Sequence, residues 1–146
     1  MIKWLLLPLM ILTSCMEDNL TPEASLKNFV EARFGNVVTR QFVIDRVTGK
    51  MRQSMENITD EEFKKFSDLR NVQKDSFKIL SKSCQEKQCF ITYSITYSTK
   101  SDDQSHFLTD VKKIAEVLSV EGKWLIADVS NVKTYHEALE PINPLE

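Results

Sequence analysis

The chain has 146 residues, of which 19 are basic and 21 acidic, so its formal net charge is −2. This balance, without a basic stripe, argues against a nucleic-acid partner, because few cations are available to neutralise phosphates. The length is typical of one domain. The chain has only three glycines, so a glycine-rich phosphate-binding loop is not expected.

Residues 1–15, MIKWLLLPLMILTSC, have the pattern of an export signal. Lys3 supplies a positive charge before an apolar run that is too short to cross a bilayer as a stable helix. The run ends in Leu12-Thr13-Ser14-Cys15, which resembles the lipobox of bacterial lipoproteins. The resemblance implies that residues 1–14 are a removed lipoprotein signal peptide and that Cys15 carries diacylglycerol, often with a further acyl chain such as palmitate. The alternative is a signal that is uncleaved or conventionally cleaved.

Residues 15–20 would then be the lipidated cysteine and a short tether, which reaches about 20 Å when fully extended. Two or more acyl chains hold a protein stably at a membrane surface, so we expect a domain that works close to the lipid. Met16 follows the cysteine in place of Asp, which by resemblance to Gram-negative sorting rules favours the outer membrane, facing the periplasm. We therefore expect a lipid-anchored protein of the bacterial cell envelope.

The segment from 21 to 35 predicts an amphipathic helix. Thr21 is a favourable N-cap, and the proline and glutamate that follow it suit the first helical turn. Apolar residues then recur at helical spacing up to a glycine that can end the helix; they are Leu26, Phe29, Val30 and Phe34.

Residues 37–56 fit two interpretations. Phe42-Val43-Ile44 alone favours a strand, whereas the wider apolar spacing favours a helix. Gly49 weakens a helix interior, so we favour a helix that is bent at Thr48-Gly49. Further on, Thr59 and Glu62 match a capping box and predict a short helix with a buried apolar side.

From residue 76 the apolar period changes to two, which predicts strands over residues 76–84 and 89–98. Cys84 and Cys89 end these strands, so a hairpin would bring them within disulfide distance. With Cys15 occupied by lipid, we expect a disulfide between them. The alternative is a zinc site with His106 as a third ligand.

Residues 109–118 are ambiguous, because Val111 and Ile114 have helical spacing while the following Val117-Leu118-Ser119-Val120 favours a strand. Glu121-Gly122 is a turn signal before a second β-rich run, so we favour a hairpin. The tail over residues 141–146 should be irregular, which leaves residues 21–140 as a single α+β domain.

Helices followed by an antiparallel meander predict an α+β fold, with N-terminal helices packed on a curved antiparallel sheet. The helix TPEASLKNFVEARF, further helices and long strands ending in VEGKWLIADV resemble the nuclear transport factor 2-like superfamily, which includes SnoaL-type proteins and small bacterial lipoproteins. The resemblance implies a cone-shaped fold whose sheet curls around a pocket. It also implies an acid–base pair in that pocket in enzymatic members, and frequent homodimers formed through the sheet.

Several strand residues are candidates for such a pocket. Asp128 interrupts the apolar run WLIADV in phase with Trp124, which makes it the candidate general base; a solvated carboxylate is the alternative. The other polar candidates are Asp110 and His106. Aromatic residues that could line the pocket, or simply fill the core, are Tyr93, Tyr97 and Trp124.

The sequence contains no nucleophile elbow, paired metal ligands or other linear catalytic motif, and no motif that indicates a cofactor. We therefore expect a non-catalytic module that binds a small apolar ligand or a protein of the envelope. The alternative is a small isomerase, cyclase or hydrolase of the cone fold, with Asp128 as general base.

Overall fold

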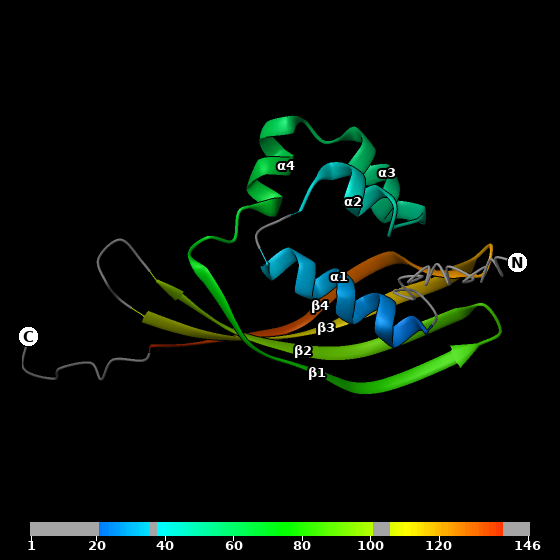
Figure 1. Ribbon diagram of the computed structural model, residues 1–146. Coiled ribbons are helices and arrows are strands. Elements are labelled where there is room, and N and C mark those ends of the chain that lie inside the picture. The colour runs from blue at the N-terminus through cyan, green and yellow to red at the C-terminus, as the bar shows by residue number, and fades with distance from the viewer. Residues whose placement is uncertain (1–20, 36–37, 101–105, 139–146) are drawn as a thin grey trace, which may run out of the picture.

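The computed structural model describes residues 21–35, 38–100 and 106–138. Within these ranges, four short helices precede four long strands (Figure 1). The helices are α1 (Pro22–Phe34), α2 (Arg40–Ile44), α3 (Gly49–Asn57) and α4 (Asp60–Ser67). The strands are β1 (Val72–Gln85), β2 (Gln88–Lys100), β3 (His106–Val120) and β4 (Lys123–Ala138), and they form one antiparallel sheet in the order β1-β2-β3-β4.

The signal segment 1–14, the tether 15–20 and the tail 141–146 lie outside the described residues. Of the helices that the structure describes, none has both the length and the apolar character needed to span a membrane.

A threonine is the N-cap of each of the four described helices, and three of these threonines accept a capping hydrogen bond with their side chain. The hydroxyl of Thr21 accepts a hydrogen bond from the amide of Ala24 at 3.1 Å, which confirms the predicted start of α1. Thr59 and Glu62 form the predicted capping box at α4, with the Thr59 amide donating to Glu62 Oε2 at 2.7 Å. Thr39 caps α2 in the same way as Thr21 caps α1.

The predicted bent helix over residues 37–56 is two helices, α2 and α3, separated by residues 45–48. In this gap Val47 forms an isolated parallel bridge with Ile126 of β4. The amide of Thr48 donates to the Ile126 carbonyl at 2.9 Å, and the Ile126 amide donates to the Arg46 carbonyl at 3.0 Å. The helix breaks here because the backbone pairs with the edge of the sheet instead of with itself.

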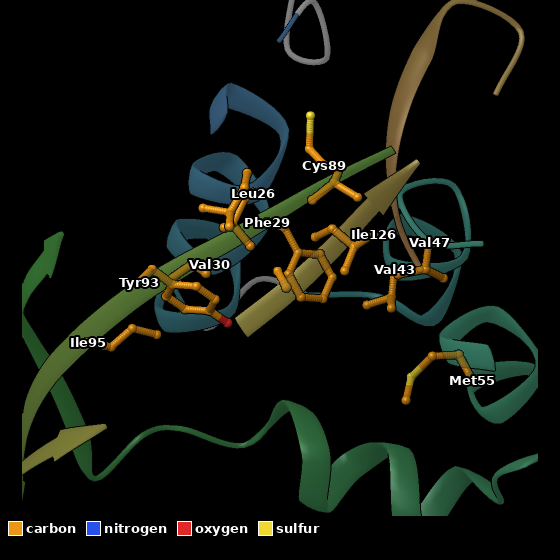
Figure 2. Packing of buried hydrophobic residues seen from close by; sticks show 13 residues of the cluster. Leu26, Phe29, Val30, Val43, Val47, Met55, Cys89, Tyr93, Ile95 and Ile126 are labelled. Carbon is orange, nitrogen blue, oxygen red and sulfur yellow. The ribbon is translucent and has the colours of Figure 1, made fainter. Parts of the chain in front are cut away.

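The first helix lies along one face of the sheet, and α2, α3 and α4 lie beyond it (Figure 1). On this helix-covered face, α1 contacts β1, β3 and β4, while α3 contacts β4. Figure 2 shows Leu26, Phe29 and Val30 of α1 lying toward β2, with Val43 and Val47 gathered near Ile126. The opposite face, which we call the open face, carries alternate residues such as Thr92, Ser94, Lys112 and Ile114.

Both predicted hairpins are present. Residues 121 and 122 form the turn between β3 and β4 with positive φ angles of 51° and 79°, as a type I′ turn requires. The ambiguous residues 109–118 are therefore strand. Cys84 and Cys89 face each other across β1 and β2 and are joined by a disulfide. Because neither sulfur is then a thiolate, the alternative zinc site is excluded in this oxidised form.

The expected cone-shaped fold is wrong. The structure is a simple four-stranded meander preceded by few and short helices. Hairpins, a capped first helix and a turn at Gly122 are local features, and they leave open how far a sheet curls and how much of it the helices cover. The architecture that these features build is a two-layer one with a half-covered sheet.

Candidate functional site

The helix-covered face of the sheet is much longer than the helix that covers it. Helix α1 has 13 residues and is ~20 Å long at ~1.5 Å per residue. Strands β3 and β4 have 15 and 16 residues and span ~50 Å at ~3.3 Å per residue. The half of this face that lies beyond Phe34 is therefore left without a helix over it.

A cavity of about 380 Å³ occupies this uncovered half. It lies between the end of α1, the segment that leads into β1, and strands β2 to β4. Its lining residues are Arg33, Phe34, Leu69, Val72, Ile95, Tyr97, Val111, Lys113, Asn131, Thr134 and His136. The volume is in the range of small-molecule sites.

A larger hollow of about 760 Å³ lies at the other end of the molecule, beside the two hairpin turns. It is lined by exposed turn residues, including Gln85, Glu86 and Lys87, and it is a broad depression in the surface. The cavity beyond α1 is the better candidate site because apolar walls and polar groups converge on it.

The apolar wall of the cavity comes from three places. Phe34 ends α1, and its ring centroid lies 5.9 Å from that of Tyr97 on β2. Val111 forms part of the floor, on β3. The segment before β1 completes the wall with Leu69 and Val72, whose backbone groups are joined by a hydrogen bond of 3.0 Å.

Arg33 is the most constrained polar residue of the cavity. Its guanidinium carbon lies 4.1 Å from the ring centroid of Phe66 on α4, and its Nη2 donates to the Phe66 carbonyl at 3.3 Å. The buried Nε has no hydrogen-bond partner in the described part of the chain. Burial lowers the pKa of Arg33, and the interaction with Tyr93 partly offsets this effect.

Tyr93 lies beneath this arginine in the core and is 2% exposed. Burial raises the pKa of its hydroxyl to about 12, against an opposing effect from Arg33. Tyr93 is therefore a neutral phenol at physiological pH and provides no negative charge to balance the guanidinium.

Lys113 brings a second cation into the same cavity. It is partly buried on β3, in phase with Val111 and Ala115 of the helix-covered face. Burial lowers the pKa of its ammonium group, and the positive charge of Arg33 lowers it further. None of the lining residues in the described ranges is acidic, so the cavity has a surplus of positive charge.

The mouth of the cavity is polar and lies along β4. Asn131, Thr134 and His136 are exposed there. The Nδ1 atom of His136 is 3.0 Å from the hydroxyl oxygen of Thr109, a buried residue of β3 that holds the ring in place. The described residues contain no cluster of histidine, cysteine, aspartate and glutamate that could hold a metal ion. The arrangement is one for binding an anion or a polar group.

The structure separates the residues that the sequence nominated for a pocket. Tyr97 lines the cavity, whereas Tyr93 is core and Trp124 is partly buried near the opposite end of β4. Asp110 is exposed on the open face, opposite Tyr135 in the register of β3 and β4. His106 begins β3, and its side chain lies outside the described atoms.

Asp128 is on the open face, away from the cavity. The register pairs Ile126 with Val117 and Asp128 with Glu116, so Ala127 is an extra residue in β4. This bulge breaks the alternation and turns Asp128 to the face opposite that of Ile126. One carboxylate oxygen of Asp128 accepts a hydrogen bond of 2.8 Å from the neighbouring Val129 amide. The expectation that Asp128 shares a face with Trp124 is therefore wrong.

Sequence reasoning missed Arg33 and Lys113, although each carries a visible signal. Arg33 lies three and four residues after the buried Val30 and Phe29, on the apolar side of α1. Lys113 is in phase with a strand's buried residues. A cation at a position where the pattern requires an apolar residue indicates either a paired charge or a site.

The chain resembles a solved structure in fold. The solution structure of a SEC-C motif containing protein from Rhodopseudomonas palustris matches it with a TM-score of 0.59 at 8% sequence identity, over 78% of this chain and 80% of that one. No protein-family model matches the chain, and no curated protein matches its sequence. The expected membership of the nuclear transport factor 2-like superfamily is therefore wrong, and the likeness is to the fold of a SEC-C motif protein. The expectation relied on the element order and on the turn at Gly122, and both features are common to different α+β folds.

Proposed function

We propose that this protein is a lipid-anchored module of the bacterial cell envelope that binds a small ligand in the cavity beyond α1. The observation that carries the proposal is the combination of apolar walls with converging polar groups at a site of about 380 Å³. The cavity is present because the strands are longer than α1, so it results from the arrangement of the elements and not from the rotamer of one side chain.

The anchor part of the proposal relies on the sequence alone. Leu12-Thr13-Ser14-Cys15 supports lipidation at Cys15, and Met16 after it supports the outer membrane, facing the periplasm. The disulfide between Cys84 and Cys89 agrees with an oxidising compartment. A partner protein of the envelope and a homodimer stay predictions.

Intact mass of the protein extracted from its own membranes tests the anchor. Loss of residues 1–14 together with added acyl mass is the expected result. A full-length chain without acyl mass, or one whose two remaining cysteines react with an alkylating reagent before reduction, would refute the proposed location.

Blocking the cavity tests the binding function. Thr134 is an exposed lining residue at the mouth, so Thr134→Trp should fill the entrance without disturbing the core. Ser130→Trp is the matched control, because Ser130 is exposed on the same strand but on the open face. Native mass spectrometry of the purified mature proteins should detect a co-purified or added small molecule in the parent and in Ser130→Trp. Equal occupancy in Thr134→Trp would place the ligand elsewhere and contradict the proposal.

The enzymatic alternative is not favoured by the site. Asp128, the residue that would act as general base, is outside the cavity, and the described lining residues include no carboxylate. Binding without chemistry is the function that the geometry supports.

A further inference from the structure

We propose that the ligand of this cavity is a carboxylate with an apolar body, whose two oxygens lie between Arg33 and Lys113. This inference deepens the proposed function and depends on it. It specifies the charge, the shape of the polar group and the character of the remainder of the molecule.

The two cations of the cavity have no acid beside them among the described lining residues. Elsewhere in the described ranges, basic side chains pair with acids in Arg40–Asp60, Arg52–Glu56, Arg70–Asp68, Lys74–Glu31 and Lys82–Glu23. Arg33 and Lys113 are the two cations of the cavity lining, and the described lining residues give neither of them an acid. Two like charges in one poorly solvated space repel each other, and a bound anion would remove that cost.

The arginine is also short of acceptors. The ring of Phe66 packs on one face of the guanidinium, and the Phe66 carbonyl accepts a hydrogen bond from one of its N–H groups. The buried Nε has no hydrogen-bond partner within the described chain. A buried donor without an acceptor is unfavourable, and a ligand oxygen would satisfy it. Because Phe66 holds the guanidinium plane, its donors are oriented before the ligand arrives.

A carboxylate fits these donors better than a phosphate does. Its two oxygens match the fork of a guanidinium, and the ammonium of Lys113 can serve the same oxygens from the side. A phosphate has a third oxygen and needs more donors, which sites for phosphate usually supply from backbone amides. Here the described lining residues come from the C-terminal end of α1, the segment before β1 and the strands, so no helix N-terminus supplies such amides.

The apolar wall defines the rest of the ligand. Phe34, Leu69, Val72, Ile95 and Val111 surround the space next to the two cations, so a hydrocarbon or aromatic body would be buried against them. A small polar acid such as acetate would leave this surface uncovered. The class is therefore an amphiphilic acid, and octanoate is a simple probe for it.

The test compares octanoate with octanol, which has the same tail and no charge. Isothermal titration of the mature protein in neutral phospholipid nanodiscs, with empty nanodiscs as the blank, should give about tenfold tighter binding of octanoate. Lys113→Gln and Arg33→Gln should each weaken octanoate by about tenfold or more and leave octanol unchanged. Lys112→Gln is the matched control, since Lys112 is the next residue of β3 and is exposed on the open face.

Equal affinities for octanoate and octanol would overturn the carboxylate inference, as would equal effects of Lys112→Gln and Lys113→Gln. If octanol binds and Thr134→Trp abolishes its binding, the cavity is a binding site and only the charge preference is refuted. If Thr134→Trp changes the binding of neither compound, the proposed function fails as well. Arg33→Gln removes a stacking contact with Phe66 and could unfold the protein. In that case the effect of Lys113→Gln on octanoate binding alone decides the carboxylate inference.

Discussion

The hydroxyl of Ser25 donates a hydrogen bond of 2.6 Å to the carbonyl oxygen of Trp124, and so joins the first helix to the last strand. Ser25 is 2% exposed, so water could not replace its hydroxyl as the partner of this carbonyl if the hydroxyl were removed. Ser25→Ala should therefore lower the free energy of unfolding by about 1–2 kcal/mol in urea denaturation. Ser130→Ala, at an exposed position of β4, should change it by less than about 0.5 kcal/mol. Equal losses would show that the bond contributes nothing.

Arg40 fastens the helices that lie beyond α1. Its Nη1 donates to the carbonyls of Met55 and Ile58 at 3.2 and 2.7 Å, and its Nη2 binds Asp60 at 2.9 Å. Arg40→Gln should cost about 1–3 kcal/mol of unfolding free energy, because the carbonyls at the end of α3 lose a charged donor. The comparison is Arg52→Gln, whose exposed pair with Glu56 should be worth at most about 0.5 kcal/mol. A smaller loss for Arg40→Gln than for Arg52→Gln would contradict the assignment.

The capping box of α4 should make the free energy of unfolding depend on pH in the acidic range. The amide and then the hydroxyl of Thr59 hold the pKa of Glu62 below its ordinary value of 4.5. Because the folded-state pKa is the lower one, the stabilisation is complete above pH 4.5 and is lost as the pH falls through the folded value. Urea midpoints measured from about pH 7 down to about pH 3 should fall less for Glu62→Gln than for the parent. Glu61→Gln, at a neighbouring exposed residue of the same turn, should follow the parent curve.

Reduction of the disulfide should weaken the fold without affecting the cavity. Closing the loop between Cys84 and Cys89 stabilises by about 2 kcal/mol in the chain-entropy model. A reducing agent should therefore lower the urea midpoint of the parent and leave that of the double variant Cys84→Ala, Cys89→Ala unchanged. Octanoate binding should persist in both proteins, because neither cysteine lines the cavity and Cys89 is four residues along β2 from Tyr93, the register partner of Lys113. Loss of binding on reduction would show that the disulfide and the cavity are coupled.

The local parts of this fold could be predicted from the sequence. The caps at Thr21 and Thr59 act within one helical turn, so the residues that decide them are adjacent in the chain. The period of two from residue 89 to residue 98 is equally local, and it places Tyr93 and Tyr97 correctly on one face. Glu121 and Gly122 mark their turn by themselves.

The parts that depend on distant segments could not be predicted. Asp128 faces the open side because Ala127 is an extra residue in β4, next to the bridge between Val47 and Ile126. No neighbour in sequence indicates that bulge. The cavity around Arg33 and Lys113 likewise depends on the length of α1 against the length of the strands it covers, and on Phe66 arriving from α4. The overall fold was misjudged for the same reason, since helices followed by hairpins are compatible with several ways of curving and covering a sheet.

The bridge between Val47 and Ile126 has a consequence for behaviour at high concentration. The outer edge of β4 would otherwise present the amide and carbonyl of Ile126 to a strand of another molecule. Arg46 and Thr48 occupy both groups at 3.0 and 2.9 Å, and Gly49, whose φ of 54° turns the chain into α3, keeps close to the adjoining Ala127. The segment between α2 and α3 thus blocks the pairing of another strand at this point of the edge, beside one of the two register shifts between β3 and β4.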